Sequence, residues 1–118
     1  MFSKSEIQIE ATEDSFKAEL ADTFLSKFIG FRFCSEGKML FPFSRDTNAL
    51  IDMMLVPEPL YLYFIDSDKQ VMEVQKADPW SLNPRTWRFY RSEESYQYLL
   101  ESFEKLDLAE GDKLQFEV

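Results

Sequence analysis

The sequence contains no histidine, which removes the commonest general base near neutral pH and the commonest zinc and copper ligand. A Ser-His-Asp or Cys-His catalytic arrangement therefore cannot be built within this chain. The single cysteine, Cys34, excludes an intramolecular disulfide, and one free thiol fits a reducing compartment. The three glycines form no phosphate-binding loop. Any acid–base chemistry would fall to carboxylates, tyrosines, lysines or Cys34.

Basic residues are in the minority, with 13 against 22 acidic residues and a net charge of −9. Because like charges repel, this excess disfavours binding to nucleic acids and to anionic membranes. No apolar run, residues 53–56 among them, approaches the ~20 residues of a membrane helix. The first residues also lack the apolar core of a signal peptide. We therefore expect a cytoplasmic protein that binds neither nucleic acid nor membrane.

The length of 118 residues and the lack of repeats, linkers or low-complexity tracts predict a single domain over residues 1–118. A chain of this length buries roughly two-thirds of the surface that its unfolded form exposes. It therefore needs no disulfide or metal to hold a core together.

Short alternating stretches bounded by turn residues dominate the rest of the pattern. Residues 6–10 alternate strictly, which predicts a half-buried strand, and residues 60–65 with the turn at 66–69 and residues 70–75 predict a hairpin. The pattern predicts a mainly β, mostly antiparallel β-sandwich of jelly-roll type. The further predicted strands are residues 16–20, 39–43, 48–56, 87–91, 96–99 and 113–118.

One stretch has helical rather than alternating periodicity. Asp22 and Thr23 are good N-cap residues, and large apolar residues recur at helical spacing after them. We therefore predict one packed α-helix over residues 23–33. A short helical turn is also predicted at residues 102–106.

Four segments resemble those of a known family in the same order. They are residues 21–30 (ADTFLSKFIG), 37–41 (GKMLF), 59–66 (PLYLYFID) and 110–114 (EGDKL). The chain resembles the domain of unknown function 192 family. This resemblance implies a compact jelly-roll sandwich with one packed helix, and it implies no activity. The chain is similar to a divergent member, because it differs from many members at Asp52 and Tyr61.

A long loop bounded by two prolines carries the strongest binding signal. Trp80 and Trp87 flank it, and Arg85 and Arg88 lie beside them. An aromatic floor beside guanidinium groups suits a planar or anionic ligand, or a peptide. The alternative is structural, with indoles that fix the loop to the sandwich and arginines that balance nearby acids. Tyr61 and Tyr63, which share a strand face, are secondary ligand-binding candidates, or ordinary residues of a half-buried sheet.

Asp52 is the candidate catalytic residue. In a strand over residues 48–56 it would share a face with Leu50, Met54 and Val56, and if that face is the core its carboxylate would be desolvated. Such carboxylates cluster at functional sites. The alternative is a carboxylate at a strand edge, or one paired with Arg45 or Lys38.

The leading hypothesis is a non-catalytic module that binds a small molecule or a protein, as a monomer or weak dimer. The alternative is a carboxylate-based hydrolase or isomerase that acts on a sugar-like substrate through Asp52. A third hypothesis is an adaptor whose sheet edge pairs with another chain. A hairpin turn explains Asp66 and Asp68, so we expect no metal site and no cofactor.

Overall fold

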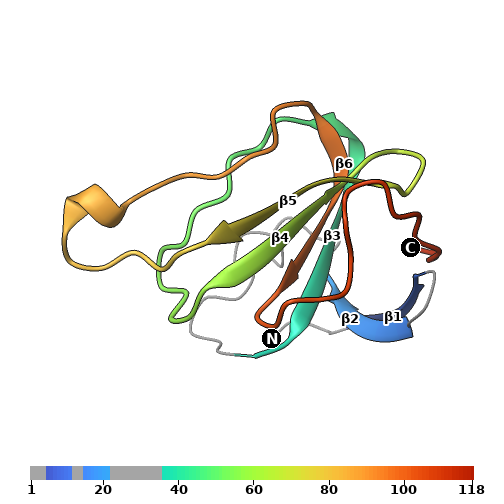
Figure 1. The fold of residues 1–118 in the computed structure, drawn as a ribbon, viewed down its shortest axis with the longest axis horizontal. Helices are drawn as coiled ribbons and strands as arrows, with labels where there is room; N and C mark the ends of the chain where they lie inside the picture. Colours follow the sequence, from blue (N-terminus) through green and yellow to red (C-terminus); the bar gives the residue numbers. More distant parts are fainter. Residues whose placement is uncertain (1–4, 12–14, 22–35) are drawn as a thin grey trace.

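The computed structural model describes residues 5–11, 15–21 and 36–118. Within these ranges the protein is mainly β, as predicted (Figure 1). No helix in these ranges is long and apolar enough to cross a membrane. The elements are β1 (Ser5–Glu10), β2 (Ser15–Leu20), β3 (Lys38–Thr47), β4 (Leu60–Ile65), β5 (Val71–Ala77), the 3-10 helix η1 (Pro84–Thr86) and β6 (Tyr96–Ser102).

The strands form one six-stranded sheet in the order β1-β2-β3-β6-β4-β5. Four neighbouring pairs are antiparallel, and β2 and β3 are parallel. The described residues thus build one mixed sheet, and the two stacked sheets of the predicted jelly-roll sandwich are not observed. Strands such as β4 are buried along nearly their whole length, so their apolar pattern does not reveal how many sheets pack together.

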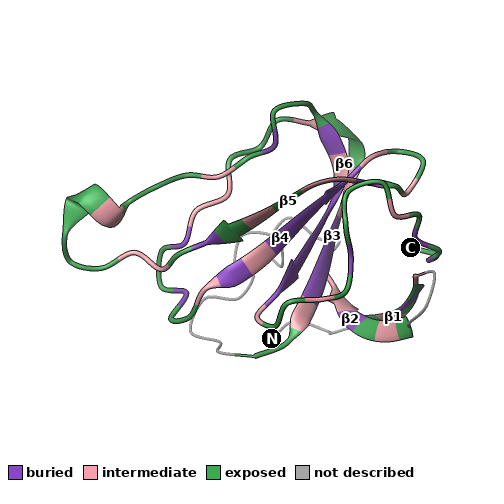
Figure 2. Ribbon diagram, viewed as in Figure 1, coloured by how far each residue is buried: buried purple, intermediate pink, exposed green. Residues whose placement is uncertain are grey.

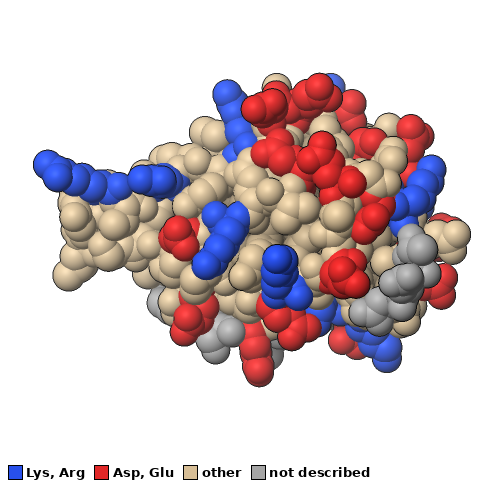
Figure 3. Space-filling view, viewed as in Figure 1, with Lys and Arg blue, Asp and Glu red and all other residues tan. Residues whose placement is uncertain are grey.

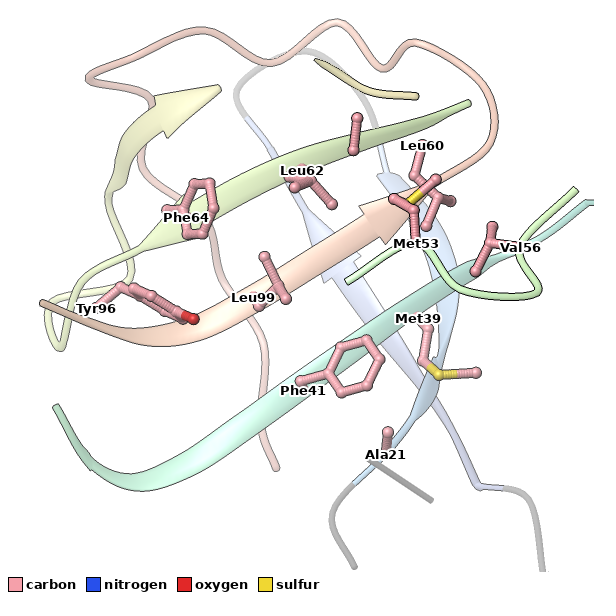
Figure 4. Close-up of a cluster of buried hydrophobic side chains, with 11 residues drawn as sticks. Ala21, Met39, Phe41, Met53, Val56, Leu60, Leu62, Phe64, Tyr96 and Leu99 are labelled. Atoms are coloured by element: carbon pink, nitrogen blue, oxygen red, sulfur yellow. The ribbon is translucent and has the colours of Figure 1, made fainter. Parts of the chain in front are cut away.

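The central strands β3, β4 and β6 of this sheet bury side chains on both faces (Figure 2). Alternation along β4 directs Leu60, Leu62 and Phe64 into one hydrophobic cluster, and Tyr63 and Ile65 into another. Figure 4 shows the first cluster, in which side chains from the sheet meet others from the irregular segment before β4. The second cluster packs against the C-terminal segment of the chain. Irregular segments therefore provide much of the cover that a second sheet would give.

The C-terminal segment joins the two edges of the sheet. Gln115 exchanges two backbone hydrogen bonds with Glu10 on β1, and Lys113 forms a bridge with Gln70 beside β5. The predicted strand at residues 113–118 is therefore reduced to two isolated bridges. Between and beside these bridges, Leu114 and Phe116 are buried in the second cluster.

The helical turn predicted at residues 102–106 is wrong. β6 runs on to Ser102, whose hydroxyl donates to the Glu104 carbonyl at 2.7 Å and accepts the Glu104 N–H at 3.2 Å. The Leu106 N–H donates to the Tyr63 hydroxyl at 2.8 Å instead of to a helical carbonyl. Side-chain groups thus take the hydrogen bonds that a helical turn would need. The α-helix predicted over residues 23–33 lies outside the described residues.

The strand predicted over residues 48–56 is reduced to one bridge. Ile51 and Tyr90 exchange two backbone hydrogen bonds of 2.7 and 2.8 Å. The chain then turns, because the Asp52 carboxylate accepts the Met54 N–H at 3.0 Å and Leu55 has a φ of 63°. An aspartate that bonds to the backbone two residues later favours a turn over a continuing strand.

Candidate functional site

Residues 78–91 form an arm that projects from the sheet and carries η1 at its end (Figure 1). Its base is fixed to the body through Tyr90. The Tyr90 backbone pairs with Ile51, and its hydroxyl accepts the Asp78 N–H at 3.1 Å. Because Ile51 and Tyr90 also pack against the first hydrophobic cluster, the base of the arm is part of the core.

The end of the arm is held by side chains that bond to its own backbone. Asn83 caps η1, since its side chain accepts the Arg85 N–H at 3.0 Å. The Thr86 hydroxyl donates to the Asn83 carbonyl at 2.7 Å and accepts the Ser81 N–H at 2.8 Å. The two sides of the loop are thereby tied together, and the conformational freedom of the arm is reduced before any partner binds.

The two tryptophans pack against each other in the middle of the arm. The rings of Trp80 and Trp87 are stacked, with centroids 5.9 Å apart and an interplanar angle of 25°. Phe89 contacts Trp80 edge to face at 5.3 Å. Trp80 also packs against the first hydrophobic cluster, so it links the arm to the core. Aromatic pairs in these geometries each contribute about 0.5–1.5 kcal/mol beyond the area that they bury.

Both indole N–H groups bond across the loop. Trp80 Nε1 donates to the Arg88 carbonyl and Trp87 Nε1 to the Ser81 carbonyl, each at 2.8 Å. The indoles therefore stabilise the arm, which is the structural alternative considered for them above. Because their donors are already in use, the rings can offer a partner only their faces and edges.

A large part of this apolar surface stays exposed. Trp87 is 50% exposed, Phe89 57% and Leu82 99%. Leu50, 56% exposed, precedes Ile51 and so lies on the outer face of the bridge, the face to which Phe89 also belongs. We call Leu50, Leu82, Trp87 and Phe89 the apolar arm surface. Large apolar side chains exposed together on one projection are candidates for an interaction site.

The arm is also the one stretch of the sequence where positive charge collects. Residues 79–91 contain three arginines and no acidic residue. The rest of the chain therefore contains ten basic residues and all 22 acidic residues. Figure 3 shows Lys and Arg side chains at the far end of the arm and Asp and Glu spread over the body. Arg85 and Arg88 are exposed, and no described carboxylate lies within ion-pair distance of either. The arginines are thus not balanced by nearby acids.

The structure brings together four of the predicted ligand-binding residues and separates the other two from them. Trp80, Arg85, Trp87 and Arg88 all lie in the arm. Tyr63 instead lies in the second cluster, fully buried, with its hydroxyl bonded to the backbone of Leu106. Tyr61, half-buried, packs against the same cluster.

Burial raises the pKa of Tyr63, partly offset by its hydrogen bond to Leu106. The environment of Tyr63 is therefore that of a core residue with a satisfied hydroxyl.

Sequence reasoning missed Phe89 and the two residues that stabilise the loop, Asn83 and Thr86. Phe89 could have been found, because it follows Trp87 by two residues in an alternating stretch. Asn83 precedes a proline at the start of η1, a common arrangement at helix N-termini. The contacts of Thr86 depend on the folded loop and have no signal in the sequence.

Asp52 does not lie on the apolar strand face expected for it. Of its three supposed neighbours on that face, Leu50 and Met54 are 56% and 44% exposed, and only Val56 is buried. Its carboxylate shapes the turn by accepting the Met54 N–H. The more deeply buried carboxylate is Glu101, which is 6% exposed.

Glu101 pairs in register with Met39 on β3 and Leu62 on β4, at the centre of the sheet. Its negative charge adds to burial in raising the pKa of Tyr96. No local pattern predicted the burial of Glu101, because glutamate is rarely buried.

A second surface feature is an open hollow of about 750 Å³ near β5 and the turn before it. Its walls carry no lysine or arginine, and the described residues contain no cluster of metal-ligating side chains. The hollow concentrates the negative charge of the body and will repel anions. Its six carboxylates belong to Asp46, Asp66, Glu73, Glu93, Glu94 and Glu110.

These features define a class of protein, a small mainly β domain with one mixed sheet and a projecting aromatic arm. The profile of the DUF192 family, described as Uncharacterized ACR, matches residues 6–116, and the chain belongs to this family. The resemblance seen in the sequence is thereby confirmed.

Curated relatives carry the family name UPF0127. One from Thermococcus gammatolerans is 30% identical over 108 residues, which cover 85% of this chain and 66% of that protein. One from Pyrococcus abyssi is 28% identical over 107 residues, which cover 85% and 86%. The chain thus spans less than two thirds of the length of the Thermococcus gammatolerans protein.

Two crystal structures share the fold. A protein from Sinorhizobium meliloti, described as a candidate transcription regulator, has a TM-score of 0.75 at 22% identity and covers 98% of this chain and 95% of its own. A protein of unknown function from Novosphingobium aromaticivorans has a TM-score of 0.73 at 20% identity, with 95% and 84% covered. At these identities the likeness concerns the fold alone.

Proposed function

We propose that this protein is a non-catalytic interaction module and that its arm contacts a partner protein. The observation that carries the proposal is the apolar arm surface, which is exposed although the arm itself is internally bonded. Binding energy at protein interfaces is concentrated in a few aromatic residues and arginines. Trp80, Trp87, Arg85 and Arg88 are residues of these types.

The internal bonding of the arm matters for affinity. A partner that orders a flexible loop must overcome about 0.5–1.5 kcal/mol for each immobilised side chain. Here the stacked indoles and the Thr86 hydrogen bonds have already ordered the loop. The arm is therefore preorganised for contact. Catalysis through Asp52 has no comparable support, because the Asp52 carboxylate bonds to the backbone of its own turn.

The test is capture of binding proteins from a native extract by the full-length chain. Trp87→Ser with Phe89→Ser replaces two of the four residues of the apolar arm surface without a change of charge. Val118→Ser, at a residue 61% exposed outside the arm, is the matched control. We expect the arm variant to lose the captured proteins by about tenfold, the equivalent of about 1.4 kcal/mol, and the control to retain them. Equal capture by the arm variant and the wild type would refute the proposal.

A further inference from the structure

We infer that the arm recognises a short acidic segment of its partner, in which carboxylates flank a large apolar side chain. This inference rests on the proposed function and specifies the chemistry of the partner. The arm offers a partner the faces of its aromatic rings and the guanidinium groups of its arginines. The two indole N–H groups cannot donate to a partner, because both already donate to carbonyls within the loop.

The sign of the charge on the partner follows from Arg85 and Arg88. Both side chains are exposed and have no carboxylate partner among the described residues. A guanidinium group matches a carboxylate in geometry and can bind it through two parallel hydrogen bonds. A segment that supplies carboxylates would therefore pair with groups that the protein itself leaves unpaired.

The order of residues in the arm also suggests the order of apolar and acidic residues in the partner segment. Trp87 lies between Arg85 and Arg88 in the chain, and its half-exposed ring is the apolar centre of that stretch. Along the chain, Arg85 precedes Trp87 and Arg88 follows it, so an apolar side chain placed on Trp87 would have a guanidinium-bearing residue on each side of it in the sequence. Carboxylates that flank the apolar residue fit this pattern of charges.

The acidic body limits the size of the partner surface. All 22 acidic residues lie outside residues 79–91, and six of them line the hollow near β5. A broad anionic surface, such as a nucleic acid or an anionic membrane, would be repelled by the body. Charges more than about 8 Å apart are largely screened at physiological ionic strength, so a narrow segment on the projecting arm is affected much less. The geometry thus favours a short peptide or a protruding loop over a polyanion.

The experiment selects peptides from a displayed random library on the full-length chain. The same library is selected in parallel on Trp87→Ser/Phe89→Ser and on Arg85→Gln/Arg88→Gln. Lys105→Gln/Lys113→Gln, which removes two exposed charges outside the arm, is the charge-matched control. We expect peptides with an apolar residue between acidic residues to be enriched on the wild type and on the control, and to be lost on both arm variants.

The strongest peptide is then titrated against each protein by tryptophan fluorescence, since both tryptophans of the chain lie in the arm. The dissociation constant is expected to rise about tenfold or more in Arg85→Gln/Arg88→Gln and to be unchanged in the lysine control. Binding should also weaken with added salt, because it depends on exposed charges.

The possible failures are distinguishable. Enriched peptides without an acidic excess, or an equal affinity for the arginine variant, would overturn the inference and leave the proposed function intact. A short oligouridine that binds more tightly than the peptide would also overturn it, since aromatic platforms with arginines can stack bases. If no peptide is enriched over the Trp87→Ser/Phe89→Ser variant, both the inference and the proposed function fail.

Discussion

At the scale of single residues, Tyr63 shows how a buried polar group is accommodated. Its ring is fully buried, and its hydroxyl accepts the Leu106 N–H at 2.8 Å and donates to the Leu106 carbonyl at 3.4 Å. One side chain thereby satisfies both backbone groups of a segment without regular structure. An unsatisfied buried donor costs about 1–3 kcal/mol, so this hydroxyl matters to the fold.

The Tyr63→Phe variant removes only this hydroxyl. We expect a loss of about 1–2 kcal/mol in the free energy of unfolding, because the Leu106 N–H is left without its partner. The measurement is urea unfolding at neutral pH. Tyr61→Phe, on the same strand but half-buried, is the control and should change stability by less than about 0.5 kcal/mol. Equal losses of unfolding free energy in the two variants would contradict a stabilising role for the Tyr63 hydroxyl.

The buried tyrosines also predict a dependence on alkaline pH. Burial raises the pKa of Tyr63 and of Tyr96, and the charge of Glu101 raises that of Tyr96 further. In the unfolded chain a tyrosine ionises near pH ~10, while in the folded protein it keeps its proton. The stability that these tyrosines contribute is therefore fully present below this pH and is lost as the pH rises above it, for Tyr96 by about 1.4 kcal/mol per pH unit.

Tyr96→Phe tests this dependence through the slope of stability against pH. Above pH ~10 the slope should become shallower by about 1.4 kcal/mol per pH unit, because one protonated group is removed from the folded state. The free energy of unfolding is measured by urea titration at several alkaline values. The variant also loses the hydrogen bond from the Tyr96 hydroxyl to the Ala49 carbonyl. This second effect lowers the free energy of unfolding by the same amount at every pH, so it does not alter the slope. An unaltered slope would argue against the raised pKa.

At the scale of elements, the arm depends on Thr86. Thr86→Val keeps the shape of the side chain but removes the hydroxyl that bonds to Ser81 and Asn83. We expect faster hydrogen exchange at the Ser81 amide, by about tenfold, and a weaker near-ultraviolet circular dichroism signal from the stacked tryptophans. Thr86→Ser retains the hydroxyl and should behave like the wild type. Because Thr86 lies in η1 at the end of the arm and belongs to neither core cluster, the free energy of unfolding should change by less than about 0.5 kcal/mol.

Individual elements could be predicted where the local pattern was strong. β4 was predicted with its observed bounds, and the alternation at residues 6–10 corresponds to β1. Two segments were predicted wrongly because side chains compete with the backbone for hydrogen bonds. Asp52 ends the extended segment before β4, and Ser102 bends the chain after β6.

The arrangement of the elements could not be predicted in the same way. β6 lies between β3 and β4, and β2 runs parallel to β3, so these pairings join residues far apart in the sequence. Local periodicity carries no information on such contacts. The loop that holds four of the candidate residues could be located from the sequence, since two prolines and two tryptophans in one loop are a local signal. Tyr63 was misplaced because a tyrosine row has the same pattern on a binding face and on a buried one.

At the scale of the whole molecule, the C-terminal segment holds the two edges of the sheet together. Leu114→Ala should lower the free energy of unfolding by about 2–5 kcal/mol, since the side chain is 1% exposed. Val118→Ala, at an exposed residue of the same segment, should change it by less than about 0.5 kcal/mol. Urea unfolding gives both values.

Hydrogen exchange of the same variants tests directly whether the C-terminal segment holds the two edges of the sheet together. In Leu114→Ala the amides of Glu10 and Val71, which bond to the C-terminal segment from opposite edges, should lose protection together. A loss of protection confined to one edge would show that the segment does not couple them.

The separation of charge between body and arm has a consequence for colloidal behaviour. An exposed aromatic projection would ordinarily drive molecules to adhere to one another, and the mutual repulsion of the acidic bodies opposes this at neutral pH. Acidification towards pH ~4 neutralises carboxylates and leaves the arginines charged. Solubility should therefore fall sharply in mild acid while the native packing persists, so precipitation of this protein would reflect lost repulsion before it reflects denaturation.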